Sequence, residues 1–109
     1  MRGPLDLGII SIPMRFEFDS QKSAANKVKH RIDFVEAQAL WDDPDRIEVP
    51  ARPMNEPRVT IIGRIAQTFW SATVTHRHED TIRIISVRRS RAYEKERYRR
   101  DRASEDADG

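Results

Sequence analysis

The sequence predicts an α+β domain: one small antiparallel β-sheet with packed helices, in the order β-α-α-β-β-β-α. Residues 58–88 contain three stretches rich in β-branched residues, joined by short polar connections. Helix-forming segments with candidate cap residues come before and after them, at 19–41 and 90–100. A chain of 109 residues with 38% hydrophobic residues can bury one core, so we expect one domain over residues 14–100.

The first elements are an extension and a strand. Polar and turn-forming residues interrupt the short apolar run of residues 1–13, so we expect no secretion signal there. We interpret this stretch as an N-terminal extension, either foreign to the native protein or adding an edge strand at 9–12. The alternation in Arg15-Phe16-Glu17-Phe18 then predicts a short strand with both Phe side chains facing the core.

Two helices are predicted next. Asp19 or Ser20 caps a helix that runs to about Lys29. The spacing of three apolar residues predicts that they face inward: Ala24, Ala25 and Val28. Asp33 followed by Glu36 matches a capping box at the start of a second helix over 34–41. This helix is expected to bury Phe34 or Val35, together with Ala37, Leu40 and Trp41.

The C-terminal half predicts an antiparallel meander of strands at 58–63, 67–76 and 81–88, because the connections between them are too short for parallel pairing. Four prolines make residues 42–58 irregular, with a short strand at 47–49 as an option. Ser90 is expected to cap the last helix, which frays near residues 99–101. Residues 101–109 are expected to form a disordered acidic tail.

The distribution of charge indicates a polyanion or an acidic protein as partner. Residues 83–100 contain eight Lys or Arg and two Glu, a local net charge of +6. An ordinary solvated surface is the alternative explanation. The chain has no cysteine and no apolar run of about 20 residues, so we expect a cytoplasmic protein without membrane spans.

Three blocks of this chain, which together cover about residues 14–98, resemble the BrnT toxin family of bacterial type II toxin–antitoxin modules. The first block consists of Phe16-Glu17-Phe18-Asp19, Lys22, Asn26, Lys29-His30, Phe34 and Glu36-Ala37. The other two consist of Arg58 with Ile62-Gly63, and of Arg83-Ile84-Ile85-Ser86-Val87-Arg88 with Glu94 and Tyr98. Two positions depart from the pattern: Phe18 replaces a Trp, and Arg31 replaces a Gly that would end the helix in a left-handed conformation.

The resemblance implies a RelE-like RNase toxin fold and an endoribonuclease that cleaves RNA and inhibits translation. It also implies a BrnA-like antitoxin, a DNA-binding dimer expected to form a heterotetramer with the toxin. RNA cleavage by the neighbouring 2′-hydroxyl needs no metal, so we expect neither metal nor cofactor. We expect no direct DNA binding by this chain. The alternative function is a non-catalytic basic module that docks a DNA-binding partner as adaptor or co-repressor.

Four arginines are candidates for contacting phosphate, because the planar guanidinium can bond two phosphate oxygens at once. Arg83 and Arg88 are predicted to be catalytic, and Arg64 and Arg89 to bind RNA. Alternation places Arg83 on the side of Ile85 and Val87, where an ion pair with Glu17, Glu94 or another acid is the competing explanation. Exposure in a solvated turn is the alternative for Arg88 and Arg89.

The remaining candidates lie on the predicted helices. His30 is the best acid–base candidate of the first half, with favourable placement at a helix C-terminus as the alternative. Lys22 and Lys29 share a helical face and could follow an RNA backbone or simply stay solvated. Glu94 enters the catalytic set, most plausibly by orienting an arginine. Tyr98 either contacts RNA or packs on the sheet.

A metal site is not expected. His76 and His78 share one face of a strand, but only Glu79 and Asp80 are nearby as further ligands. Zinc sites need three or four positioned ligands.

Overall fold

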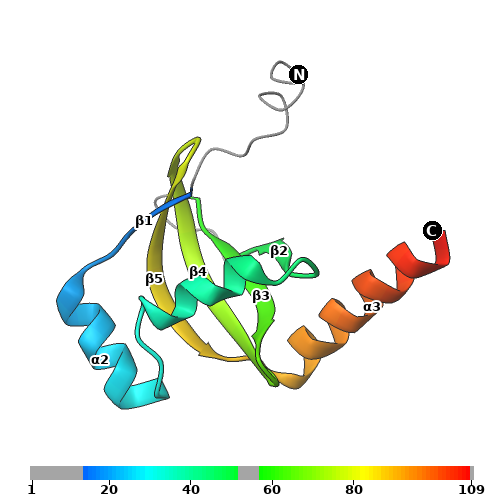
Figure 1. The fold of residues 1–109 in the computed structure, drawn as a ribbon, viewed down its shortest axis with the longest axis horizontal. Helices are drawn as coiled ribbons and strands as arrows, with labels where there is room; N and C mark the ends of the chain where they lie inside the picture. The colour runs from blue at the N-terminus through cyan, green and yellow to red at the C-terminus, as the bar shows by residue number, and fades with distance from the viewer. Residues whose placement is uncertain (1–13, 52–56, 109) are drawn as a thin grey trace, which may run out of the picture.

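The computed structural model describes residues 14–51 and 57–108, which form a five-stranded sheet flanked by helices (Figure 1). The extension at 1–13, with its optional edge strand, lies outside the described residues. The strands lie in the order β1-β5-β4-β3-β2. Their bounds are β1 (Arg15–Glu17), β2 (Ile47–Pro50), β3 (Val59–Ile65), β4 (Thr68–His78) and β5 (Thr81–Arg89). The helices are α2 (Ser20–His30), the 3₁₀ helix η1 (Glu36–Asp42) and α3 (Ala92–Asp108).

The sheet is mixed, so the expectation of a purely antiparallel sheet is wrong. β3, β4 and β5 form the predicted antiparallel meander, and β2 adds a fourth antiparallel strand at the optional position. β1, however, pairs with β5 in parallel, with Phe16 opposite Ile82. The long connection from β1 to the meander permits this pairing, because it crosses over through α2 and η1. The observed order is therefore β-α-3₁₀-β-β-β-β-α.

One face of the sheet carries the hydrophobic core, and the other is open over much of its width. α2 and η1 lie at the core face, where η1 crosses the strands (Figure 1). The buried cluster there consists of Ile32, Phe34, Ala37, Leu40, Ile61, Trp70, Ala72, Val74, Ile82, Ile84 and Val87. Gly63 permits the close approach of η1, because a Cβ at this position would lie 3.1 Å from Leu40 Cδ2.

A β-bulge in the β4–β5 pair decides which side chains share a face. Thr73 pairs with Ser86 but Val74 pairs with Ile84, so one residue of β5 is left over. Simple alternation placed Arg83 with Val87, and this prediction is wrong. Val87 is fully buried in the core, whereas Arg83 pairs with Thr75 on the opposite face.

The buried side of α2 is polar, contrary to the prediction from its apolar residues. Asp19 caps the helix as predicted, with its carboxylate accepting from the N–H groups of Gln21 and Lys22. Ser23 and Asn26 are the buried residues, whereas Ala24, Ala25 and Val28 are exposed. Ser23 and Asn26 face inward because α2 lies against backbone groups at the edge of β5 and in the segment after the helix. These backbone groups have no partner in the sheet and need polar side chains as hydrogen-bonding partners.

The predicted capping box is confirmed, although it opens a 3₁₀ helix. The Glu36 N–H donates to Asp33 Oδ1 at 2.7 Å, and the Asp33 N–H donates to Glu36 Oε1 at 2.9 Å. Phe34, Ala37 and Leu40 are buried as expected, and Val35 is exposed.

α3 starts and ends differently from the prediction. Ser90 does not cap it: the Ser90 hydroxyl faces inward, 2.7 Å from Ser71 Oγ. The helix begins at Ala92, and the Glu94 carboxylate accepts from the Arg91 N–H at 2.7 Å. It continues to Asp108, through most of the stretch in which we expected disorder. No helix in the described part of the chain is long and apolar enough to cross a membrane.

Replacing Arg31 with glycine is expected to stabilise the fold. Arg31 ends α2 with φ 68° and ψ 22°, the left-handed conformation expected for the glycine of the family pattern. A side chain in this region costs about 1 kcal/mol, and glycine avoids that cost. Arg31→Gly should therefore raise the midpoint of thermal unfolding by several degrees in calorimetry. Arg31→Lys is the matched control and should leave the midpoint unchanged; an equal effect of both changes would contradict the explanation.

Candidate functional site

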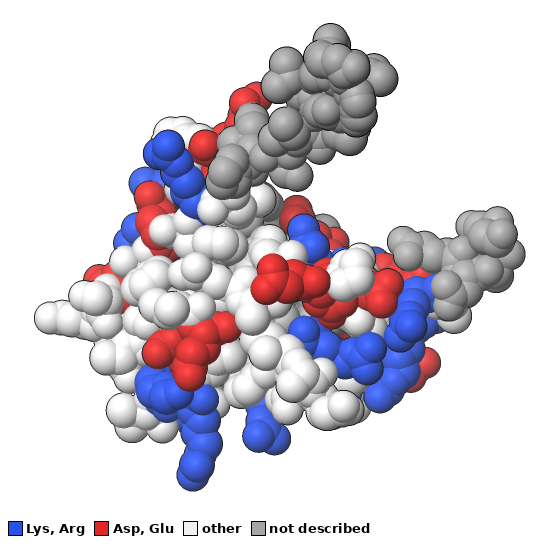
Figure 2. Space-filling model, viewed as in Figure 1, with Lys and Arg blue, Asp and Glu red and all other residues white. Residues whose placement is uncertain are grey.

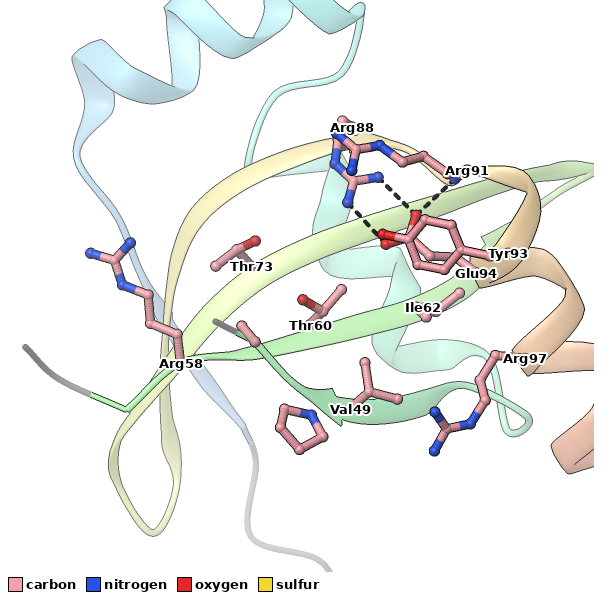
Figure 3. Close-up of a pocket in the computed structure, with 12 residues that line it drawn as sticks. Val49, Arg58, Thr60, Ile62, Thr73, Arg88, Arg91, Tyr93, Glu94 and Arg97 are labelled. Carbon is pink, nitrogen blue, oxygen red and sulfur yellow. Dashed lines mark hydrogen bonds and ion pairs between the residues drawn. The ribbon is translucent and has the colours of Figure 1, made fainter. Parts of the chain in front are cut away.

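The open face of the sheet forms a pocket between α3 and the start of β3 (Figure 3). Its cavity is about 450 Å³, a size found for small-ligand sites. The strand register aligns the side chains that form its floor: Thr60 opposite Thr73, and Ser71 opposite both Ile62 and Arg88. The lining residues are Val49, Pro50, Ala51, Arg58, Thr60, Ile62, Thr73, Arg88, Arg91, Tyr93, Glu94 and Arg97.

A bidentate ion pair lies at one end of the pocket. Arg88 Nη1 donates to Glu94 Oε1 at 2.8 Å, and Arg88 Nη2 donates to Glu94 Oε2 at 2.9 Å (Figure 3). Glu94 Oε1 also accepts from Ser71 Oγ at 3.0 Å and from the Arg91 N–H. The Glu94 side chain is only 6% exposed, whereas that of Arg88 is 31% exposed. Glu94 therefore holds the guanidinium in one orientation while part of it stays open to the pocket.

The surroundings keep both members of the pair ionised. Burial opposes ionisation of Glu94, but the hydrogen bonds from Arg88, the Arg91 N–H and Ser71 outweigh it and lower the pKa of this carboxyl. The hydrogen bonds to Glu94 raise the pKa of Arg88 above its ordinary value, against the opposing effect of burial. Glu94 is thus a weak base near neutral pH, which suits an orienting role better than proton transfer.

Three further arginines line the pocket, and none of them was a predicted site residue. Arg91 directly precedes α3, Arg97 lies within it, and Arg58 lies at the opposite end from Arg88 (Figure 3). Arg58 Nε is buried without a hydrogen-bond partner among the residues that the structure describes. The excess of positive charge in residues 83–100 pointed toward Arg91 and Arg97. Only the family pattern drew attention to Arg58, because its approach to the pocket depends on strand pairing.

Arg83 and Arg89, predicted to join Arg88, do not line the same pocket. Arg83 Nη1 lies 3.4 Å from Glu17 Oε1, which is the competing ion pair considered above. Arg89 lies on the other face of the sheet from Arg88, with its guanidinium 5.7 Å from the centre of the Trp70 ring. Consecutive residues of a strand point to opposite faces, and β5 extends through Arg89 instead of turning at Arg88.

Arg64 and Tyr98 lie together where α3 packs on β3. Arg64 is within β3, not in the turn after it, and its guanidinium is 5.8 Å from the centre of the Tyr98 ring. Tyr98 is only 1% exposed, packs edge to face on Phe69 and donates its hydroxyl to Asp43 Oδ2 at 3.0 Å. Burial and the Asp43 carboxylate raise the pKa of this hydroxyl. The Tyr98 ring thus packs on the sheet and is not accessible to a base.

The candidates on α2 are outside the pocket lining. Lys22 and Lys29 are exposed, and His30 is half-buried at the end of the helix. Asn26 joins this helix to β5: its Nδ2 donates to the Val87 carbonyl at 3.0 Å, and the Val87 N–H donates to its Oδ1 at 3.3 Å. α2 is thereby fixed at the edge of β5, one residue from Arg88.

His76 of β4 makes a surface contact with a carboxylate. His76 Nε2 lies 3.3 Å from Glu48 Oε1 of β2. Within residues 14–51 and 57–108, no group of three or more His, Cys, Asp or Glu side chains could hold a metal ion.

The positive charge is unevenly distributed over the molecule. On the face viewed in Figure 2, Lys and Arg side chains gather along α3, whereas η1 carries the acidic residues Glu36 and Asp42. The pocket therefore lies beside residues 83–100, the stretch with a local net charge of +6. The fold and the site define a small α+β protein whose open sheet face is lined with arginines, a class suited to binding a polyanion.

Sequence comparison identifies the family. A profile described as the ribonuclease toxin BrnT of type II toxin–antitoxin systems matches residues 18–94. The chain belongs to this BrnT ribonuclease toxin family. A search of curated proteins gave no match.

A solved structure shares the fold. It is the crystal structure of the Brucella abortus ribonuclease toxin BrnT, with a TM-score of 0.54 and 17% sequence identity. The match covers 72% of this chain and 97% of that chain. At this identity the similarity concerns the fold alone. The relation to RelE-like toxins stays a prediction.

Proposed function

We propose that this protein is the toxin of a type II toxin–antitoxin module, an endoribonuclease that cleaves RNA and thereby inhibits translation. The observation that carries the proposal is the pocket in which Arg88, oriented by Glu94, lies among further arginines. In this arrangement the scissile phosphate binds Arg88. The neighbouring 2′-hydroxyl loses its proton and attacks the phosphorus, the bond from phosphorus to the 5′-oxygen breaks, and the 5′-oxygen gains a proton, which leaves a 2′,3′-cyclic phosphate. No metal is needed, because the nucleophile belongs to the substrate.

The proposed contribution of the arginines is electrostatic. Charge accumulates on the phosphorane oxygens as the 2′-oxygen attacks, and fixed cations stabilise that charge more than the charge of the ground state. Glu94 acts as a positioning residue: it restricts the Arg88 side chain, so less freedom is lost when phosphate binds. Arg91 adds further positive charge beside Arg88, and Arg97 adds it at another part of the pocket wall (Figure 3).

Proton transfer is proposed for the edge of β5. Lys22, Asn26 and Lys29 occupy neighbouring positions around α2, because seven residues make about two helical turns. Asn26 bonds to Val87, so both lysines and the following His30 belong to a helix anchored beside Arg88. An RNA strand leaving the pocket over this edge would meet these side chains. We propose that Lys22 and Lys29 contact its backbone and that His30 is the acid–base group.

The proposed partner is a BrnA-like antitoxin that covers the arginine-lined pocket and so excludes RNA. The membership of the chain in a type II toxin–antitoxin family supports an antitoxin partner. The alternative function, a basic module that docks a DNA-binding protein without catalysis, is favoured by one observation. Among the described residues that line the pocket there is no histidine, and the one carboxylate, that of Glu94, is tied to Arg88.

Induced expression in a bacterial host, alone and together with the adjacent gene, tests the proposed function. We expect growth arrest and decay of cellular RNA with the chain alone, and recovery when the neighbour is co-expressed. The purified protein should cleave RNA equally well with and without an excess of EDTA. Normal growth and intact RNA in the presence of abundant, folded protein would favour the binding module, and loss of cleavage in EDTA would contradict metal independence.

A further inference from the structure

The rim of the pocket carries an exposed aromatic side chain. Tyr93, in the first turn of α3, is 64% exposed although its ring lines the pocket beside Glu94 (Figure 3). The ring is thus accessible to a ligand in the pocket, and the neighbouring arginines can hold the charge of a polyanion. Proteins that bind single-stranded nucleic acid combine a basic groove with aromatic rings on which unpaired bases stack. Tyr93 has the exposure and the surroundings that such stacking requires.

The two ends of the pocket offer separate positive groups. Arg88 and Arg91 lie at one end, and Arg58 lies at the other (Figure 3). Arg88 of β5 is level with Ile62 of β3, and Arg58 precedes Ile62 by four residues. The backbones of the two ends are therefore offset by about 13 Å along the strands and by two strand spacings across them, and the long arginine side chains can reach inward from both. This length leaves room for a nucleoside between two bound phosphates. Arg58 brings a guanidinium to its end of the pocket, and this planar group can bond two phosphate oxygens at once.

The floor between the ends suits a nucleoside. Thr60 and Thr73 pair across β3 and β4 and supply two hydroxyl groups, while Val49 and Ile62 supply apolar surface. Hydroxyl groups can bond the sugar or a base edge, and apolar side chains can pack against the flat faces of the ring. The alternation of the strands brings these four side chains to the same face as Arg88.

We propose that the pocket binds an unpaired nucleotide of single-stranded RNA, with its base stacked on Tyr93 and its flanking phosphates held by Arg58 and by Arg88 with Arg91. The inference rests on the proposed function and deepens it, because it specifies a substrate that is single-stranded at the bound nucleotide. A base paired in a duplex cannot present its face to Tyr93, so paired RNA is excluded from this mode of binding.

Binding of a fluorescent 2′-O-methyl RNA tests the stacking. This oligonucleotide lacks the attacking hydroxyl and stays intact, so its affinity is measured apart from cleavage. Tyr93→Ala should weaken binding about tenfold, and Tyr93→Phe should bind like the original protein. A set of oligonucleotides, each with one abasic position at a different place, locates the stacked base. Binding to the original protein should weaken for one of these oligonucleotides only, and with that oligonucleotide Tyr93→Ala should cause no further loss of affinity. Equal affinity for all variants, or for duplex and single strand, would overturn the proposal.

The salt dependence of the same binding tests Arg58. Each phosphate contact of a single strand contributes about 0.7 to the slope of log affinity against log salt concentration. Arg58→Met should lower the slope by about that amount, whereas Arg89→Met, the same charge change on the other face, should not. Equal slopes for the two variants would overturn the second phosphate contact.

Parallel cleavage assays separate this inference from the proposed function. If RNA with its normal 2′-hydroxyl groups binds with the predicted dependence on Tyr93 but is never cleaved, the proposed ribonuclease activity is wrong and the proposed nucleotide site is retained. If Tyr93→Ala cleaves the same oligonucleotide as well as the original protein does, the ribonuclease activity is retained and the proposed stacking of a base on Tyr93 is wrong.

Discussion

Arg88→Lys is expected to lower the rate of RNA cleavage by about 100-fold and to abolish toxicity while the protein stays folded. Lysine keeps a positive charge beside Glu94, so the buried carboxylate is not left without a counter-ion. It loses the planar fork that bonds Glu94 at 2.8 and 2.9 Å and presents the remaining N–H groups to phosphate. Removing one positioned donor to a developing oxyanion typically costs about 10²–10³-fold.

The measurement is a single-turnover cleavage rate at saturating protein, with circular dichroism as the check on folding. Arg89→Lys is a matched control, because it makes the same change at the next residue but on the opposite face of β5. It should stay within about twofold of the original rate. A folded Arg88→Lys variant with an unchanged rate would remove Arg88 from the proposed catalytic site, and equal losses in both variants would indicate a general effect of charge on β5.

Asn26→Asp is expected to destabilise the protein by about 3 kcal/mol, the largest effect that we predict on the fold. The Asn26 amide donates to the Ile32 and Val87 carbonyls at 2.8 and 3.0 Å and accepts from the Val87 N–H. An aspartate of the same shape keeps only the last bond and turns a carboxylate oxygen toward two carbonyls. Each buried polar group left without a partner costs about 1–3 kcal/mol.

Urea denaturation of the purified variant measures this loss, with Gln21→Glu as a control for the same charge change at an exposed position of α2. The control should stay within about 0.5 kcal/mol of the original protein. A loss below about 1 kcal/mol would show that Asn26 does not join α2 to the sheet as the hydrogen bonds indicate.

The residues behind these two predictions show how far sequence reasoning extends. Arg88, Glu94 and Asn26 all stood out in the sequence, the first two for their chemistry and the third as part of the family pattern. The sequence also indicated that Glu94 orients an arginine, but it left Glu17, Glu94 or another acid as the partner of Arg83. The pairing of Arg88 with Glu94, and of Arg83 with Glu17, depends on how β1 and α3 meet β5.

Local sequence determined the features that need only near neighbours. The Asp19 cap, the reciprocal bonds of Asp33 and Glu36, and the meander of β3, β4 and β5 follow from residues a few positions apart. The left-handed backbone at Arg31 follows from its place in the family pattern. Short-range hydrogen bonds and turn lengths fix these features before any tertiary packing is considered.

Only the tertiary structure decided which residues share the pocket. A bulge of one residue in β5 separates Arg83 from Val87, and the extension of β5 through Arg89 turns that side chain away from Arg88. Arg58 reaches the same pocket through pairing with distant strands. Alternation along a strand is a two-residue pattern, so one extra residue reverses every face assignment that follows it, and its position depends on the partner strand.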